Sequence, residues 1–170
     1  MAKIDYLFSL MEPADYARYT PHLTAVSCSD REYLIHLNAE IFDIDLEEAS
    51  AFVNSSLDDD RCKAWLIVGK DETRPLPPAG SVPSTEPTDG MTVIGCFILY
   101  CTPTFASMAG FGLLEEYRGR GLSIESLDLI CGKLPQTVKR MDAHTDSENP
   151  TTCSLYQKYG FVILDSIEGE

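Results

Sequence analysis

Residues 117–123 read Tyr-Arg-Gly-Arg-Gly-Leu-Ser and lie where a predicted strand ends and a predicted helix begins. The first turn of a helix leaves backbone N–H groups without partners and carries partial positive charge. Gly119 and Gly121 would let a phosphate group approach this backbone closely, while Arg118 and Arg120 add full positive charges. The stretch therefore predicts a pyrophosphate-binding turn. It matches neither the Walker pattern nor the G-x-G-x-x-G pattern, and a glycine turn can also simply end a strand.

Residues 149–161 form a second informative stretch, Asn-Pro-Thr-Thr-Cys-Ser-Leu-Tyr-Gln-Lys-Tyr-Gly-Phe. Asn149 is a good N-cap, Pro150 suits the first helical position, and Gly160 suits the position just past the end of a helix. The pattern predicts a helix between Pro150 and Gly160, followed directly by a final strand at Phe161 to Leu164.

The two stretches together resemble the GNAT superfamily of acyl-CoA-dependent N-acetyltransferases. The phosphate-binding motif of that family is Gln or Arg, two residues, Gly, one residue and then Gly or Ala, usually after an aromatic residue. Its downstream motif is N-x-x-A-x-x-L-Y-x-x-x-G-F, at a similar separation. The matching residues are Tyr117, Arg118 and Gly121 in the first motif, and Asn149, Leu155, Tyr156, Gly160 and Phe161 in the second.

Three positions depart from the family pattern. Ser123 replaces the usual Gly or Ala, Glu115 replaces a frequent Pro, and Thr152 replaces the usual Ala. Ser and Thr are small enough to be tolerated, whereas a carboxylate at position 115 close to a pyrophosphate would repel it. The match is good over residues 91–165 and loose over the first 60 residues.

The resemblance implies an α/β fold of the α+β kind: one mixed, mostly antiparallel sheet with helices on both faces and a parallel strand pair that splays apart. A length of 170 residues suits one domain, which we expect to span residues 1–170. Residues 71–90 hold five of the ten prolines and no aromatic residue. They predict a long loop between two strands, either a tolerated surface insertion or a functional flap.

Hydrophobic periodicity predicts the remaining elements. Up to about Asp60 the chain is expected to be helical after an opening strand at Ile4 to Phe8, with one helix that runs from Asp30 and a second that starts after the N-cap Asp45. Runs rich in Val, Ile and aromatic residues then predict strands at Cys62 to Gly69, Met91 to Thr102, Phe111 to Leu114 and Val138 to Thr145. A helix between the last two strands makes a βαβ crossover, which requires these two strands to be parallel.

The resemblance implies acetyl-CoA as cosubstrate, no metal ion, and a site at the splayed strands. The residues that would bind the cosubstrate are Phe111, Leu113, Leu114, Arg118, Gly119, Arg120, Gly121, Leu122, Ser123 and Asn149. Tyr156 stands at the general-acid position of the family, and a phenol is protonated at neutral pH. No general base can be assigned, because Thr102 to Leu114 contains no carboxylate. His144 and Asp142 could act through water.

The implied activity is transfer of an acetyl group to a primary amine, a cationic small molecule or a peptide, by direct attack in a ternary complex. One alternative is an acceptor that is a protein N-terminus or lysine side chain. Another is a catalytically silent acyl-CoA-binding domain, which the missing base and Glu115 favour. Thiol release with a panel of amines distinguishes these. Dimers are common in proteins that resemble this one.

The net charge of −14 restricts the partners. Nucleic acid is excluded, because its binding relies on Lys and Arg that neutralise phosphates. Six scattered cysteines without a C-x-x-C pair predict free thiols and no metal centre, and no apolar run is long enough to cross a bilayer, so we expect a cytoplasmic protein. The acidic residues concentrate before Met91, where they would attract a cationic acceptor and make its binding salt-sensitive: Asp43, Asp45, Glu47, Glu48 and Asp58 to Asp60.

Overall fold

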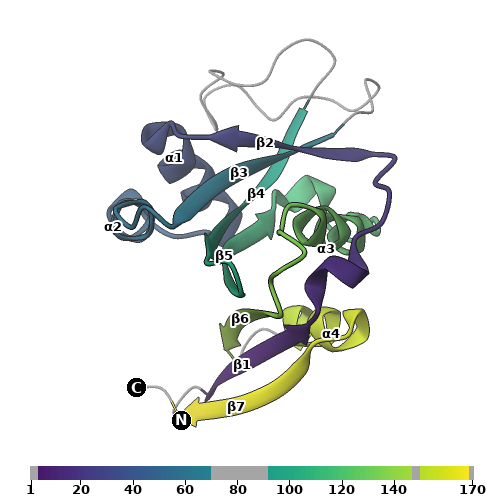
Figure 1. The fold of residues 1–170 in the computed structure, drawn as a ribbon. Coiled ribbons are helices and arrows are strands. Elements are labelled where there is room, and N and C mark those ends of the chain that lie inside the picture. Colours follow the sequence, from purple (N-terminus) through teal and green to yellow (C-terminus); the bar gives the residue numbers. More distant parts are fainter. Residues whose placement is uncertain (1–3, 70–91, 147–149, 169–170) are drawn as a thin grey trace.

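The computed structural model describes residues 4–69, 92–146 and 150–168 (Figure 1). The loop expected at 71–90 and the expected N-cap Asn149 lie outside the described residues. The elements are, in chain order, β1 (Ile4–Met11), the 3-10 turn η1 (Pro13–Tyr16), β2 (Leu23–Cys28), α1 (Arg31–Phe42), α2 (Leu46–Leu57), β3 (Cys62–Gly69), β4 (Thr92–Cys101), β5 (Phe105–Leu113), η2 (Glu115–Tyr117), α3 (Leu122–Gly132), β6 (Arg140–Asp146), α4 (Pro150–Tyr159) and β7 (Val162–Glu168).

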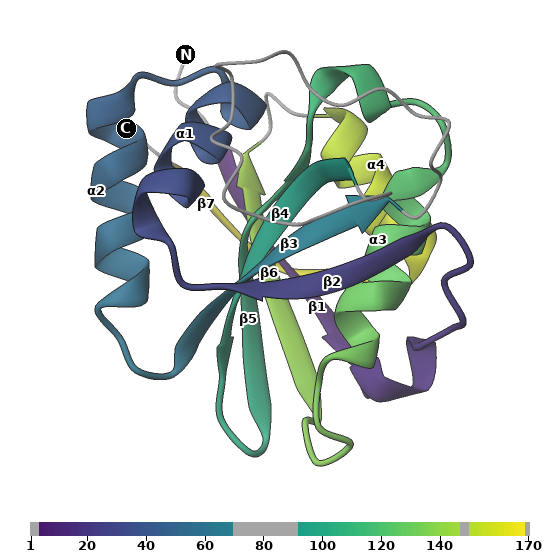
Figure 2. The same ribbon diagram turned by 90° about the horizontal axis from the view of Figure 1, so that it is seen from above.

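The strands form one mixed sheet in the order β2-β3-β4-β5-β6-β1-β7. Only β5 and β6 pair in parallel among the described strands, and the other neighbours are antiparallel. Helices α1 and α2 lie on one face of the sheet, and α3 and α4 lie on the other (Figure 2). The expected mixed, mostly antiparallel sheet with helices on both faces is confirmed.

Local capping explains where the helices begin and end. The Asp30 side chain accepts a hydrogen bond from the Tyr33 amide at 3.1 Å, and the Asp45 side chain accepts one from the Glu48 amide at 2.8 Å. Each bond satisfies one of the amides that a helix N-terminus leaves free. Helix α4 starts at Pro150 and is followed by Gly160, whose φ is 131°. The helix starts expected at these positions are therefore confirmed.

The N-terminal third differs from its expected arrangement in two ways. The opening strand extends to Met11 and lies inside the sheet, where β1 pairs with both β6 and β7. Residues 23–28, expected within a helical zone, instead form strand β2, which pairs with β3 at the sheet edge. The helical expectation was wrong for these residues. A strand of six residues has little local signal of its own, and its pairing with β3 determines its conformation.

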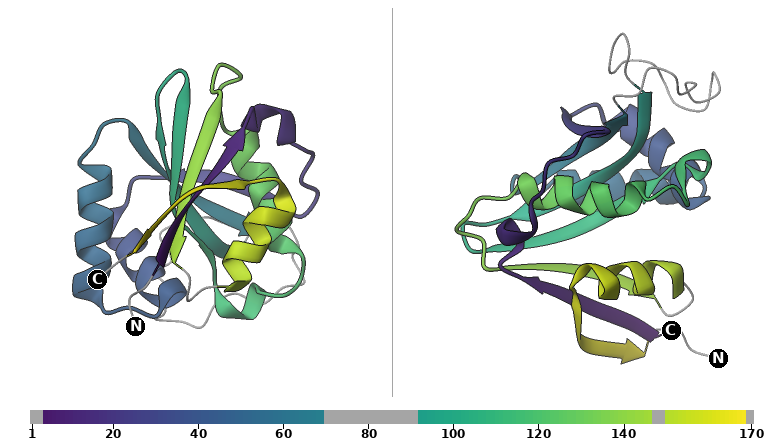
Figure 3. Two further views of the ribbon diagram at one scale, coloured as in Figure 1. Left: turned by 90° about the horizontal axis from the view of Figure 1, so that it is seen from below. Right: turned by 90° about the vertical axis from the view of Figure 1, so that its right-hand side faces the viewer.

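The sheet divides between β5 and β6. Their parallel pairing covers only Phe105 to Met108 against Arg140 to Ala143. Beyond these pairs β6, β1, β7 and α4 diverge from the part that contains β2 to β5, as Figure 3 shows. The expected splayed pair is confirmed, and the divergence opens the interior of the sheet toward the start of α3. None of the described helices is long and apolar enough to cross a membrane.

Candidate active site

A cavity of about 830 Å³ opens where β5 and β6 separate. Its walls come from the end of α1, the start and middle of α2, the C-terminal half of β5, the turn before α3, the end of β6 and the first two turns of α4. The cavity therefore extends from the glycine turn through the split in the sheet to α1 and α2. A ligand that occupies its whole length would contact both sides of the split.

Strand β5 bulges where it lines this cavity. Ala109 pairs with Ile98 and Gly112 pairs with Cys96, so that Gly110 and Phe111 lie together opposite Phe97. Gly110 has a φ of 59°, which favours glycine. A bulge takes backbone groups out of the regular ladder, and here these groups border the cavity. They are suited to orient a carbonyl group or a chain of amides in a ligand.

The glycine turn at the start of α3 has the geometry of an anion site. Gly119 and Gly121 have φ values of 74° and 78°, and a Cβ added at either residue would have no heavy atom within 4 Å. Gly121 is the N-cap of α3 and makes no side-chain capping bond. The first-turn amides of α3 thus lie beside open space, as close approach of a phosphate requires.

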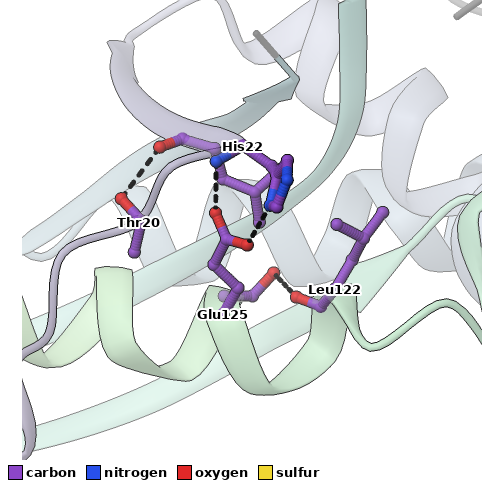
Figure 4. A network of polar contacts seen from close by, with 6 residues as sticks. Thr20, His22, Leu122 and Glu125 are labelled. Atoms are coloured by element: carbon purple, nitrogen blue, oxygen red, sulfur yellow. Dashed lines mark hydrogen bonds and ion pairs between the residues drawn. The ribbon is translucent and has the colours of Figure 1, made fainter. Parts of the chain in front are cut away.

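One carboxylate in the first turn of α3 is held by a loop from the other end of the chain. Glu125 accepts a hydrogen bond from the His22 backbone amide at 2.7 Å, and its other oxygen lies 2.9 Å from His22 Nδ1 (Figure 4). In the same segment the Thr20 hydroxyl donates a hydrogen bond to the Leu23 carbonyl at 2.9 Å. The two His22 contacts tie the segment before β2 to α3, the helix that follows the glycine turn.

The two arginines of the turn have different surroundings. Arg118 lines the cavity, and its guanidinium donates hydrogen bonds to the backbone oxygens of Leu113 at 2.9 Å and Ile41 at 2.6 Å. The Arg120 guanidinium lies over the Tyr117 ring, 5.7 Å from its centroid, and its side chain is exposed. Arg118 therefore joins the ends of α1 and β5, whereas the Arg120 charge remains accessible to an anion.

Tyr156 lies on α4 and lines the cavity from the side of β6. Its side chain is 4% exposed, and its ring packs against Phe8 and Phe161 at centroid distances of 5.4 and 5.0 Å. Burial raises the pKa of Tyr156 above its ordinary value of 10.0. The phenol therefore keeps its proton at neutral pH, and it can donate that proton to a group in the cavity.

The other expected site residues divide into two groups. Phe111, Leu113, Gly119 and Ser123 line the cavity, whereas Leu114, Arg120, Gly121 and Leu122 do not. The Leu114 amide donates to the Ile94 carbonyl at 2.7 Å, and the Leu114 and Leu122 side chains are buried in the core.

The two residues considered as bases also differ. His144 is exposed and lines the cavity. Asp142 does not line the cavity. Its two carboxylate oxygens accept hydrogen bonds from the Arg140 guanidinium, both at 2.7 Å, and the carboxylate also accepts one from the Ser9 hydroxyl. The geometry therefore leaves His144 and not Asp142 in a position to exchange protons with a ligand.

The acidic helices before Met91 were expected to attract the acceptor, but the sequence did not identify the apolar residues that α1 and α2 contribute to the cavity wall. Ile41, Phe42, Ile44 and Phe52 line the cavity, together with the carboxylate-bearing Glu48. Glu48 is one of the acidic residues expected from the sequence to attract a cationic acceptor. Glu48 lies in the first turn of α2, directly after the Asp45 cap. The sequence predicts this local position, but it does not show that the turn borders the same cavity as β5.

No group of three His, Cys, Asp or Glu side chains gathers to hold a metal ion within residues 4–69, 92–146 and 150–168. None of the six cysteines forms a disulfide bond, and Cys28, Cys96 and Cys131 are buried while the other three are partly exposed.

A mixed sheet that splits between two parallel strands, with a glycine turn at the start of the next helix, is the architecture that the resemblance to acetyltransferases implied. The family model described as "Acetyltransferase (GNAT) family" matches residues 30–161. Because this match covers most of the chain, the protein belongs to the GNAT family of acetyltransferases. The comparison with curated proteins gave no match.

Solved structures agree on the fold. A conserved protein of unknown function from Staphylococcus epidermidis has a TM-score of 0.64 at 13% identity, with 98% of this chain and 60% of that chain covered. A GCN5-related N-acetyltransferase from Sphaerobacter thermophilus has a TM-score of 0.63 at 15% identity, with 97% and 50% covered. A GNAT family acetyltransferase from Elizabethkingia anophelis, solved with acetyl-CoA bound, has a TM-score of 0.55 at 17% identity, with 85% and 79% covered. The chain thus spans between half and three fifths of the length of the first two.

Proposed function

We propose that the protein transfers an acetyl group from acetyl-CoA to a primary amine by direct attack within a ternary complex. The observation that supports this most strongly is the single cavity that joins the glycine turn at Gly119 to the buried phenol of Tyr156 through the split sheet. One end of this cavity suits a pyrophosphate, and the other end has room for a second substrate.

Binding of acetyl-CoA would use mainly backbone groups. The amides at Gly119 to Ser123 would hold the pyrophosphate, with the exposed Arg120 adding charge. The bulged backbone at Gly110 and Phe111, together with Leu113, would pair with the pantetheine arm and orient the thioester carbonyl. Asn149 would contact the same arm.

The reaction needs one proton donor close to sulfur. The neutral amine attacks the thioester carbon, the C–N bond forms and the C–S bond breaks. Tyr156 donates its proton to the departing sulfur, and the proton that the nitrogen loses passes to solvent, from which Tyr156 is protonated again. The exposed His144 on the same wall is suited to relay that proton. Fixed dipoles of the bulge stabilise the developing oxyanion.

Two tyrosine variants test this proposal. Tyr156→Phe should lower kcat for amine acetylation by about 100-fold or more, the usual contribution of a general acid, with acetyl-CoA affinity retained. Tyr159→Phe is the matched control on the same helix, because the Tyr159 hydroxyl bonds Asp128 at 2.6 Å and Tyr159 does not line the cavity. It should lower stability and leave kcat unchanged.

The measurements are free thiol release with a panel of amines and calorimetric titration with acetyl-CoA. Unchanged turnover in Tyr156→Phe would remove Tyr156 from the mechanism. Tight binding of acetyl-CoA without thiol release on any amine would instead favour a silent acyl-CoA-binding domain.

A further inference from the structure

The wall that α1 and α2 contribute to the cavity is apolar except for one carboxylate. Four of its side chains are apolar, namely Ile41, Phe42, Ile44 and Phe52, and the fifth is Glu48. Phe42 is 40% exposed, which is unusual for so large an apolar side chain. We call these five residues the α1–α2 wall. An exposed apolar surface inside a cavity indicates contact with an apolar part of a ligand.

Both aromatic rings of this wall lie directly against the bulged part of β5. A Cβ on Gly110 would come within 2.9 Å of the Phe52 ring, and a Cβ on Gly112 would come within 3.0 Å of the Phe42 ring. The bulge is where the thioester is proposed to lie. A molecule that attacks the thioester from this side must therefore pack against Phe52 and Phe42.

The acidic residues around the wall are not equivalent. Asp45 caps α2, Asp58 binds Arg31 at 2.8 Å, and Asp59 binds Arg61 at 3.1 Å through both its oxygens. None of these three lines the cavity, whereas Glu48 does. Among the described residues, Glu48 is the only carboxylate in the cavity lining, so the cavity offers one negative charge beside two aromatic rings.

We propose that the acceptor is a primary amine carried on an apolar, aromatic or branched aliphatic body. This inference rests on the proposed function and names its substrate class. Glu48 attracts the ammonium form of the amine, and the rings of Phe42 and Phe52 bury its apolar body. A polyamine or a lysine-rich peptide fits poorly, because its further positive charges would lose water against an apolar wall without gaining a second carboxylate.

Three acceptors of different chemistry test the class. We expect kcat/KM for 2-phenylethylamine to exceed the values for spermidine and for a lysine-containing tetrapeptide by at least about tenfold, the discrimination that an apolar pocket provides. A preference for spermidine or the peptide would overturn the acceptor class and leave the acetyltransferase function standing. Absence of thiol release with all three amines, despite acetyl-CoA binding, would contradict the function itself.

Matched variants test the role of Glu48. Glu48→Gln should raise KM for 2-phenylethylamine by about fivefold, the size of an ion pair in a partly exposed site, with kcat unchanged. Glu47→Gln is the control, since Glu47 lies in the same first turn, carries the same charge and does not line the cavity. It should leave KM unchanged.

An uncharged analogue separates charge recognition from packing. Inhibition by 2-phenylethanol, which lacks the ammonium group, should be equal in the parent protein and in Glu48→Gln, and should weaken in Phe52→Leu. Equal losses for the amine and the alcohol in Glu48→Gln would show that Glu48 acts on the shape of the wall and not by its charge.

Discussion

The Arg118 side chain and the backbone of Ile41 are joined by a hydrogen bond of 2.6 Å between Nη2 and the carbonyl oxygen, across 77 residues of sequence. A second bond from Arg118 Nε reaches the Leu113 oxygen at 2.9 Å. Arg118, which precedes the glycine turn, thus connects the last turn of α1 to the end of β5. Both ends border the cavity, so this side chain helps determine its width.

Loss of this connection should cost stability. A lysine at position 118 would keep the positive charge. It lacks the planar guanidinium whose separate N–H groups reach the Leu113 and Ile41 carbonyls at the same time. We expect Arg118→Lys to lower the free energy of unfolding by about 1–3 kcal/mol, the range for hydrogen bonds from a charged donor. Arg120→Lys is the control and should change it by less than about 0.5 kcal/mol, because the Arg120 guanidinium contacts the ring of Tyr117, which a lysine ammonium can also approach. Urea unfolding measures both, and equal effects would contradict the role of Arg118.

The open space beside the glycine turn leads to a second prediction. Gly119→Ala places a methyl group where no protein atom lies within 4 Å but where the pyrophosphate is proposed to bind. The variant should lose at least about tenfold in acetyl-CoA affinity, while the left-handed backbone costs about 1–2 kcal/mol of stability.

Gly132→Ala provides the comparison for the glycine turn. Gly132 ends α3, and a Cβ there would make an ordinary contact of 3.8 Å with Ala17. We expect unchanged acetyl-CoA affinity and equal or higher stability. If calorimetric titration gave Gly119→Ala the parent affinity, the phosphate site would have to lie elsewhere.

The bulge at Gly110 should not tolerate a side chain. Gly110→Ala combines a φ of 59° with a contact of 2.9 Å to the Phe52 ring. We expect a loss of about 1–3 kcal/mol in stability and a large fall in kcat, because the backbone that is proposed to orient the thioester would shift. Adding Phe52→Leu should restore part of the stability, since it removes the contact but not the strained φ. A double-mutant cycle by thermal unfolding measures this coupling, and a coupling of zero would exclude the contact as the cause.

Stability should fall at alkaline pH through Cys96. Burial raises the pKa of this thiol from its ordinary 9.0 to about 12. Between these values the unfolded state loses the thiol proton while the folded state keeps it, so the unfolded state binds fewer protons and the free energy of unfolding falls as pH rises. The expected slope is about 1.4 kcal/mol per pH unit above pH 9, with no contribution below it.

The variant Cys96→Ala isolates this slope. It should be less stable at pH 7 because a buried side chain is shortened, yet its stability should fall less steeply between pH 9 and 10.5. Urea unfolding over this range measures the difference between the two slopes, in which the tyrosines common to both proteins cancel. Parallel slopes would show that another group causes any alkaline loss.

The sequence by itself determined the features that depend on neighbouring residues. The caps at Asp30 and Asp45 bond amides three residues away, and the glycine turn and the start of α4 at Pro150 follow from local backbone preferences. These features, with the hydrophobic runs of the strands, identified the βαβ crossover, whereas the splaying of its two strands was implied by the resemblance to the GNAT superfamily. Local hydrogen bonds and allowed φ values require no knowledge of the rest of the chain.

Only the tertiary structure decided which distant segments meet. The pairing of β1 with β6 and β7, the strand state of residues 23–28, and the approach of Phe52 to Gly110 depend on contacts between residues far apart in the chain. The same holds for Glu48, which the sequence presents as one acid among several and the fold selects to line the cavity. Glu48 lines the cavity because α1 and α2 pack against β5. The side of a helix that faces a strand is decided by the apolar surface that both of them bury, and this surface includes residues far apart in the chain.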